Sequence, residues 1–142
     1  MPRTPPPPHI LEFLRKPNPA VIASARPDGQ PVSVATWYLL EDDGRILVNM
    51  DEGRRRLHYL RHDPRVSLTV LAEHDWGTHV SVQGTVADLS PDPDLAGIDR
   101  LSRHYTGQPY PTRNRGRVNG WITIESWHGW HIEGVGASRD RS

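Results

Sequence analysis

The sequence has no cysteine, no net charge and no long apolar run, and each absence excludes a class of protein. Without cysteine, the 142-residue chain can form no disulfide framework, no thiolate nucleophile and no cysteine-based zinc or iron–sulfur site. Basic and acidic residues both number 17, so no overall field attracts nucleic acid or an anionic membrane. No segment approaches the roughly 20 apolar residues of a membrane span, and the opening MPRTPPPPHI lacks the apolar stretch of a signal peptide. We therefore expect a soluble cytoplasmic domain without nucleic-acid or membrane partners.

Several familiar catalytic motifs are also missing. No Gly-x-Gly-x-x-Gly follows a strand, which argues against a Rossmann-bound nicotinamide. No serine lies in a nucleophile-elbow context, so acyl transfer has no support. His128 and His131 are three residues apart, and on a strand such residues face opposite sides of the sheet. We therefore expect no metal site.

The first half of the chain changes from a helical to a strand pattern. Four prolines at 5–8 predict a stiff polyproline arm over residues 1–9, and the segment from Ile10 to Leu14 predicts a short helix that ends at Pro17. Three apolar segments then follow, separated by Asp28-Gly29 and by EDDG at 41–44. This turn chemistry is typical of antiparallel hairpins.

The second half predicts more strands and one more helix. Residues 65–74 and 78–89 form two strands joined across DWG, with Gly84 at a bulge or close approach. A helix over 93–105 is expected to be capped by Ser90 or Asp92, with apolar residues 95, 98 and 101 facing inward. One last strand or pair lies within 116–136. This order favours a small antiparallel barrel over residues 10–136, followed by a tail at 137–142. Such a barrel has little interior room, so a ligand would sit at its mouth or at a subunit interface.

The basic segment MDEGRRRLHYLRHDPRVSL at 50–68 is the strongest functional signal. If a helix begins near Asp51 to Gly53, its free N–H groups and dipole favour an anion. The three arginines at 54–56 leave that helix about 100° apart, while Leu57 and Leu60 anchor it. The segment is then either a phosphate site or a solvated basic helix face. The acids at 51 and 52 would oppose an anion unless one of them caps the helix.

Four segments resemble a known family. They are ARPDGQPVSVATWYLLEDDGRILVNMDEGRRRLHYLRHDPRVSL, VQGTVADL, IDRLSRHYTGQPYP and the closing WHGW. Together they are similar to the flavin/deazaflavin oxidoreductase superfamily, the split barrels related to pyridoxamine 5'-phosphate oxidase, and most of all to the actinobacterial branch that uses coenzyme F420. The resemblance covers Leu11 to Trp130. It implies a mainly β fold, a six-stranded antiparallel split β-barrel that forms a homodimer with two cofactor sites at the interface.

The resemblance also implies cofactor-binding residues. The segment along the deazaflavin ring corresponds to Ser33, Val34, Ala35, Thr36 and Trp37. Asn49 matches a polar position near the phosphate, and Arg54, Arg55 and Arg56 would bind that phosphate. Members usually carry Arg-x-Lys-x-x-Asn-Leu here; Arg56 keeps the cation of the lysine, whereas Tyr59 lacks the amide of the asparagine. Trp37 could equally belong to the barrel core.

The functional expectation is hydride transfer from reduced F420 to an unsaturated, planar organic acceptor, with no catalytic side chain assigned. Trp76 and His79 are candidates for the acceptor pocket. The basic stretch TRNRGR, which includes Arg113, Arg115 and Arg117, is either a solvated loop or a contact for the polyglutamate tail of the coenzyme. Two alternatives stay open: an FMN-dependent oxidase or reductase on the same fold, and a non-catalytic carrier of a deazaflavin or haem-type ligand.

Overall fold

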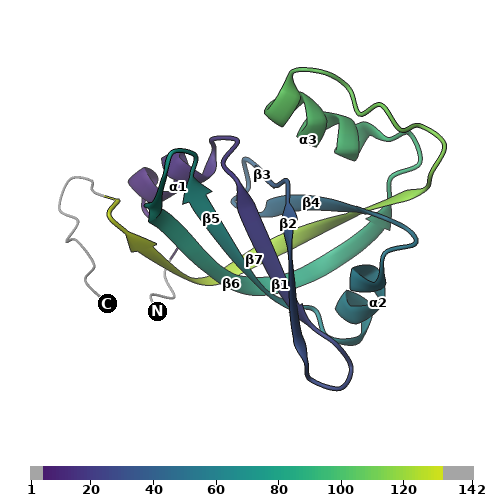
Figure 1. The fold of residues 1–142 in the computed structure, drawn as a ribbon, viewed down its shortest axis with the longest axis horizontal. Coiled ribbons are helices and arrows are strands. Elements are labelled where there is room, and N and C mark those ends of the chain that lie inside the picture. The colour runs from purple at the N-terminus through teal and green to yellow at the C-terminus, as the bar shows by residue number, and fades with distance from the viewer. Residues whose placement is uncertain (1–4, 133–142) are drawn as a thin grey trace.

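A curved antiparallel sheet and three helices make up the computed structural model, which describes residues 5–132 (Figure 1). The start of the proline-rich arm (1–4) and the predicted tail (137–142) lie outside these residues. In chain order the elements are α1 (Pro8–Leu14), β1 (Ala20–Ala25), β2 (Pro31–Thr36), β3 (Leu39–Leu40), β4 (Ile46–Asp51), α2 (Arg55–His62), β5 (Arg65–Ala72), β6 (Asp75–Pro91), α3 (Ala96–Thr106) and β7 (Arg117–Trp130).

The strand order is β2-β1-β5-β6-β7-β4-β3, so the two edge strands are consecutive in the chain. Only Trp37 and Tyr38 connect them, which leaves the barrel split between β2 and β3. The mainly β split barrel and its two N-terminal hairpins are confirmed, but the sheet has seven strands, not six. Tyr38 explains the extra strand: its side chain is fully buried and its hydroxyl donates to the Lys16 carbonyl at 3.0 Å. This inward turn ends β2 and leaves β3 as a separate pair of residues.

The long strands β6 and β7 connect the two halves of the barrel. Their pairing shifts register between Gln83 and Gly84. A Cβ on Gly84 would lie 2.0 Å from the Thr123 carbonyl oxygen, which confirms the predicted bulge and close approach. The turn before β6 lies at Glu73 and His74, because the DWG segment already belongs to the strand.

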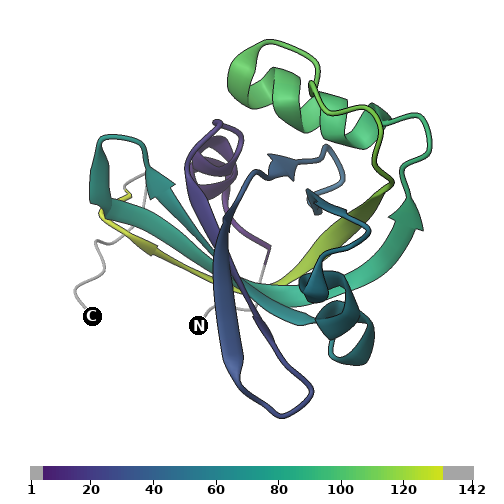
Figure 2. The same cartoon turned by 45° about the vertical axis from the view of Figure 1, so that its right-hand side comes forward.

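Two apolar clusters hold the elements together. The larger one fills the barrel, and α1 contributes Ile10 and Leu14 to it. The second cluster lies between α3 and the sheet, where Ile98 and Leu101 pack on Leu47 of β4. As a result α3 covers one side of β4, and α2 lies at the other end of that strand (Figures 1 and 2).

Both later helices begin after their predicted starts. The backbone of Leu95 is left-handed (φ 60°), so α3 starts at Ala96 and not at residue 93. The predicted cap is nonetheless correct in substance, because Asp92 accepts hydrogen bonds from the N–H groups of Gly97 and Ile98, both at 3.0 Å. Between residues 5 and 132, no helix is long and apolar enough to cross a membrane.

Candidate functional site

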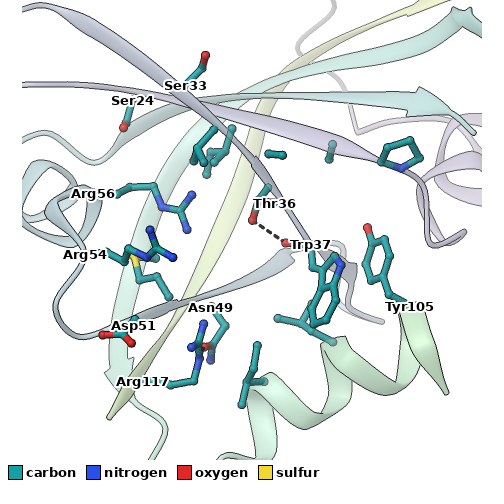
Figure 3. A pocket seen from close by; sticks show the side chains of 18 of the residues that line it. Ser24, Ser33, Thr36, Trp37, Asn49, Asp51, Arg54, Arg56, Tyr105 and Arg117 are labelled. Atoms are coloured by element: carbon teal, nitrogen blue, oxygen red, sulfur yellow. Dashed lines mark hydrogen bonds between the residues drawn. The ribbon is translucent and has the colours of Figure 1, made fainter. Parts of the chain in front are cut away.

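An open cleft of about 1060 Å³ lies between the β1–β2 hairpin, the end of β4, the start of α2, and α3 (Figure 3). All nine cofactor-binding residues expected from the sequence line it, namely Ser33, Val34, Ala35, Thr36, Trp37, Asn49, Arg54, Arg55 and Arg56. The fold thus brings β2, β4 and the start of α2 to one cavity. The β2 group is separated from Asn49 by more than ten residues of chain, whereas Asn49 and the three arginines come from consecutive elements.

Three arginines converge at one end of the cleft. Arg54 and Arg56 come from the start of α2, and Arg117 comes from the first residue of β7 (Figure 3). Within residues 5–132 none of the three forms an ion pair. The Nε of Arg56 is buried and has no hydrogen-bond partner there. Burial lowers the pKa of Arg56, and the neighbouring charges of Arg54 and Arg117 lower it further. A buried N–H donor without a partner is costly, and three cations gather at this end of the cleft, so the arrangement favours an anionic ligand.

The helix of the arginine run begins later than expected. Asp51 accepts a hydrogen bond from the Gly53 N–H at 2.8 Å, and the backbone of Arg54 is still extended (φ −72°, ψ 134°). The chain therefore turns before α2, and Arg54 is the residue that precedes the first helical turn. Leu57 and Leu60 are buried, as predicted. The helix start keeps its favourable dipole for an anion, and the arginines extend from it.

Asp51, an acidic residue that lines the cleft just before the arginine run, is already paired. Asp51 forms an ion pair with Arg115, and this contact, with the Gly53 hydrogen bond, lowers the pKa of the carboxyl group to about 2. Arg113 is bound to Asp99 at 2.7 Å. Two arginines of the predicted basic loop therefore neutralise acids, and only Arg117 enters the cleft. The sequence analysis assigned Arg117 to the basic loop. The alternating strand pattern that begins at this residue could have placed it on β7 instead.

We expect the Asp51–Arg115 pair to contribute stability that is lost on acidification. The folded-state pKa of Asp51 is below its ordinary value, so its contribution to stability is present above pH of about 4 and is lost as pH falls toward 2. Asp51→Asn should therefore make the melting temperature less dependent on pH in this window, as measured by thermal denaturation. If wild type and variant lose stability in parallel between these pH values, the pair does not act in this way.

The other end of the cleft is aromatic. The rings of Trp37 and Tyr105 are stacked with centroids 5.4 Å apart, and Tyr110 meets Trp37 edge-on at 6.2 Å. The Tyr105 hydroxyl donates to the Asn18 carbonyl at 2.7 Å, and burial raises its pKa to about 12. Tyr105 therefore stays protonated at neutral pH. The sequence pattern does not indicate that these tyrosines line the cleft, because their contacts with Trp37 each span about 70 residues of chain.

Trp76 and His79 lie apart from this cleft. Both belong to the first residues of β6, and neither lines the cavity. Trp76 is 79% exposed, and His79 stacks on Trp130 with centroids 4.5 Å apart. Their role in an acceptor pocket remains a prediction. Across residues 5–132, no group of three or more histidine, aspartate or glutamate side chains is placed to hold a metal ion.

Comparison with known proteins gives a family and several related folds. Residues 6–131 match the model of the pyridoxamine 5'-phosphate oxidase family. An F420 reductase structure is 24% identical with a TM-score of 0.74, covering 82% of this chain and 94% of that one. A conserved hypothetical protein from Mycobacterium tuberculosis is 26% identical with a TM-score of 0.70 (94% and 89% covered). A putative pyridoxamine 5'-phosphate oxidase from Listeria innocua is 17% identical with a TM-score of 0.59 (84% and 94% covered). No curated protein sequence matches the chain.

Proposed function

Because this chain belongs to the pyridoxamine 5'-phosphate oxidase family, we propose that its cleft binds a flavin-type cofactor, specifically the deazaflavin F420, and that the protein is an F420-dependent reductase. The observation that supports this most directly is the buried Nε of Arg56, which lacks a partner among residues 5–132 and lines the cleft. A phosphate is the anion that an arginine fork and a helix start both favour.

The residues of the cleft divide between binding and orientation. Arg54, Arg56 and Arg117 would hold the phosphate, and the backbone of residues 33–36 would lie along the ring system. When bound, reduced F420 supplies a hydride for an unsaturated organic acceptor. The stacked rings of Trp37 and Tyr105 would form an apolar wall at the other end of the cleft. Tyr105 keeps its proton at neutral pH, and its hydroxyl is held by the Asn18 carbonyl, so we assign it no acid or base role.

The preference for F420 over FMN rests on the arginine-rich segment that resembles the F420-using branch. The solved F420 reductase shares the fold of this chain. The family name keeps an FMN-dependent oxidase or reductase as the second candidate. Both cofactors carry a phosphate, so the arginine cluster fits either one, and the binding preference has to be measured.

Turnover separates a reductase from a non-catalytic carrier. We expect the purified protein to accelerate reoxidation of reduced F420 by at least one acceptor from a panel of planar enones and quinones, followed by recovery of the absorbance of the oxidised coenzyme. A boiled sample controls for the uncatalysed reaction. Saturable F420 binding with no acceleration by any acceptor in the panel would favour the carrier.

We also expect the protein to be a homodimer. The edge strand β2 exposes apolar side chains in the single chain, where Val34 is 46% exposed, and the same strand forms the open side of the cleft. A second copy that packs on β2 would bury this strand and close the cavity. Sedimentation at micromolar concentration should give the mass of two chains. A stable monomer that still binds F420 would show that the cleft is complete without a partner.

A further inference from the structure

Next to the cleft, a cluster of hydrogen-bonded polar side chains connects β4, β7 and the segment before α3. Asn49 of β4 is 6% exposed, and Asp92, just before α3, is 4% exposed. The Asn49 side chain donates from Nδ2 to Asp92 Oδ2 at 3.1 Å and to Asn119 Oδ1 at 2.7 Å. Its Oδ1 accepts a hydrogen bond from Arg117 Nε at 2.6 Å. Both N–H groups of the amide are thus used inside the protein, so Asn49 has no donor left for a ligand.

Asp92 determines which way that amide faces. Its two carboxylate oxygens accept from the first N–H groups of α3 and from Asn49. Its own backbone N–H donates to the Arg117 carbonyl at 2.9 Å. A carboxylate can only accept hydrogen bonds, so Asn49 must direct its Nδ2 group toward Asp92 and its oxygen toward Arg117. A flipped amide would place donors against the Nε–H of Arg117.

The backbone around this group is under strong local constraint. Leu95 has a left-handed conformation, which is unfavourable for a leucine. A Cβ on Gly97 would lie 2.0 Å from Asn119 Oδ1, so the Asn119 side chain would have to move to admit any larger residue. Together with the hydrogen bonds of Asp92, these features fix the start of α3 against β4 and β7.

Arg117 is the residue through which this group reaches the cleft. Its Nε is held by Asn49, and its Cζ lies 4.9 Å from the centroid of the Tyr110 ring. Its two terminal nitrogens have no hydrogen-bond partner within residues 5–132, and the side chain lines the cavity (Figure 3). A guanidinium held at Nε and against a ring presents its terminal N–H groups in one orientation, which suits an anion with several oxygens.

We propose that Asn49 and Asp92 are positioning residues that orient Arg117 toward an anionic group of the ligand, and that Asn49 itself does not touch the ligand. This rests on the proposed function in one respect, that the cleft binds an anion. It gives Asn49, which the resemblance placed near the phosphate, an indirect role in binding. The same hydrogen bonds attach α3, which carries Tyr105, to the strand that carries Arg117.

A double-mutant cycle tests this with pyrophosphate as the probe, by calorimetry at one fixed salt concentration. Asn49→Ala and Arg117→Ala should each weaken pyrophosphate binding by about tenfold. The double variant should bind no more weakly than Arg117→Ala, because Asn49 acts only through Arg117. Asn119→Ala is the matched control: it removes one hydrogen bond from the same amide but leaves the contacts with Asp92 and Arg117, so affinity should change less than about twofold.

Three outcomes overturn the proposal. The first is a further loss of about tenfold in the double variant, which would mean that Asn49 contacts the anion directly. The second is a loss of affinity in Asn119→Ala as large as in Asn49→Ala. The third is the absence of pyrophosphate binding by the wild type. If pyrophosphate binds as expected but F420 does not, the positioning role stands while the proposed cofactor is wrong.

A measurement on the wild type is independent of how well the variants fold. The Nε–H signal of Arg117 in a nitrogen–proton NMR spectrum, assigned by its loss in Arg117→Lys, should exchange slowly with water, because Asn49 accepts that proton. Arg55 Nε–H, on an exposed side chain, should exchange fast. Equal exchange rates for the two groups would contradict the proposal.

Discussion

Replacing Arg56 by methionine should weaken F420 binding by about one to two orders of magnitude, because a hydrogen bond to a charged group is typically worth about 1.5–3 kcal/mol. The same change should raise the melting temperature of the ligand-free protein by about 2 °C, since it removes a buried, unpartnered Nε and a charge that burial disfavours. Fluorescence titration and thermal denaturation measure the two effects. A variant that loses F420 affinity but gains melting temperature would show that Arg56 contributes to ligand binding and not to folding stability.

Two variants on the same helix act as controls. Arg61 is exposed in the last turn of α2 and does not line the cleft, so Arg61→Met should leave affinity within about twofold. Arg55 is exposed and lines the cleft, so the loss of F420 affinity in Arg55→Met should be smaller than in Arg56→Met and larger than in Arg61→Met. If Arg56→Met and Arg61→Met bind F420 as tightly as wild type, the arginine run is a solvated helix face, the alternative that the sequence left open.

Gly84→Ala should strongly destabilise the sheet. The added Cβ would lie 2.0 Å from the Thr123 carbonyl oxygen and 3.1 Å from Ile122 Cγ2, so β6 and β7 would have to separate at the bulge. Overpacking against backbone costs about 3 kcal/mol, which lowers the melting temperature of a domain of this size by about 10 °C.

The matched control is Gly77→Ala in the same strand. A Cβ added at Gly77 would lie 3.4 Å from Asp75 Oδ1, which is an ordinary contact. The free energy of unfolding should therefore change by only about 0.5 kcal/mol. Thermal denaturation of both variants gives the comparison. Similar melting temperatures for Gly84→Ala and Gly77→Ala would mean that the close approach at β7 relaxes without cost.

The parts of the fold that depend on local pattern could be predicted from the sequence. Alternating apolar residues and the turns at Asp28-Gly29 and at 41–44 predict both N-terminal hairpins, and an isolated glycine in a strand predicts the bulge at Gly84. The run of three arginines before two leucines predicts the basic end of the cleft. These features arise from residues close together in the chain.

What could not be predicted depends on contacts between distant residues. The break between β2 and β3 follows from the hydrogen bond of Tyr38 to Lys16, which no strand pattern contains. The left-handed backbone of Leu95 is unexpected for a leucine, and it shifts the start of α3. Arg117 enters the cleft because β7 pairs with β4 and places it near Asn49, 68 residues away in the chain. Tertiary structure thus decides which of the basic residues face the cleft.

The most direct measurement of the central claim is a side-by-side titration of the purified protein with F420, FMN and FAD, with Arg56→Met as a parallel sample. We predict saturable binding of F420 that is tighter than that of FMN or FAD, and a loss of about tenfold or more for F420 in the variant. Tight FMN binding with no detectable F420 binding, or equal F420 affinity in wild type and variant, would contradict the account.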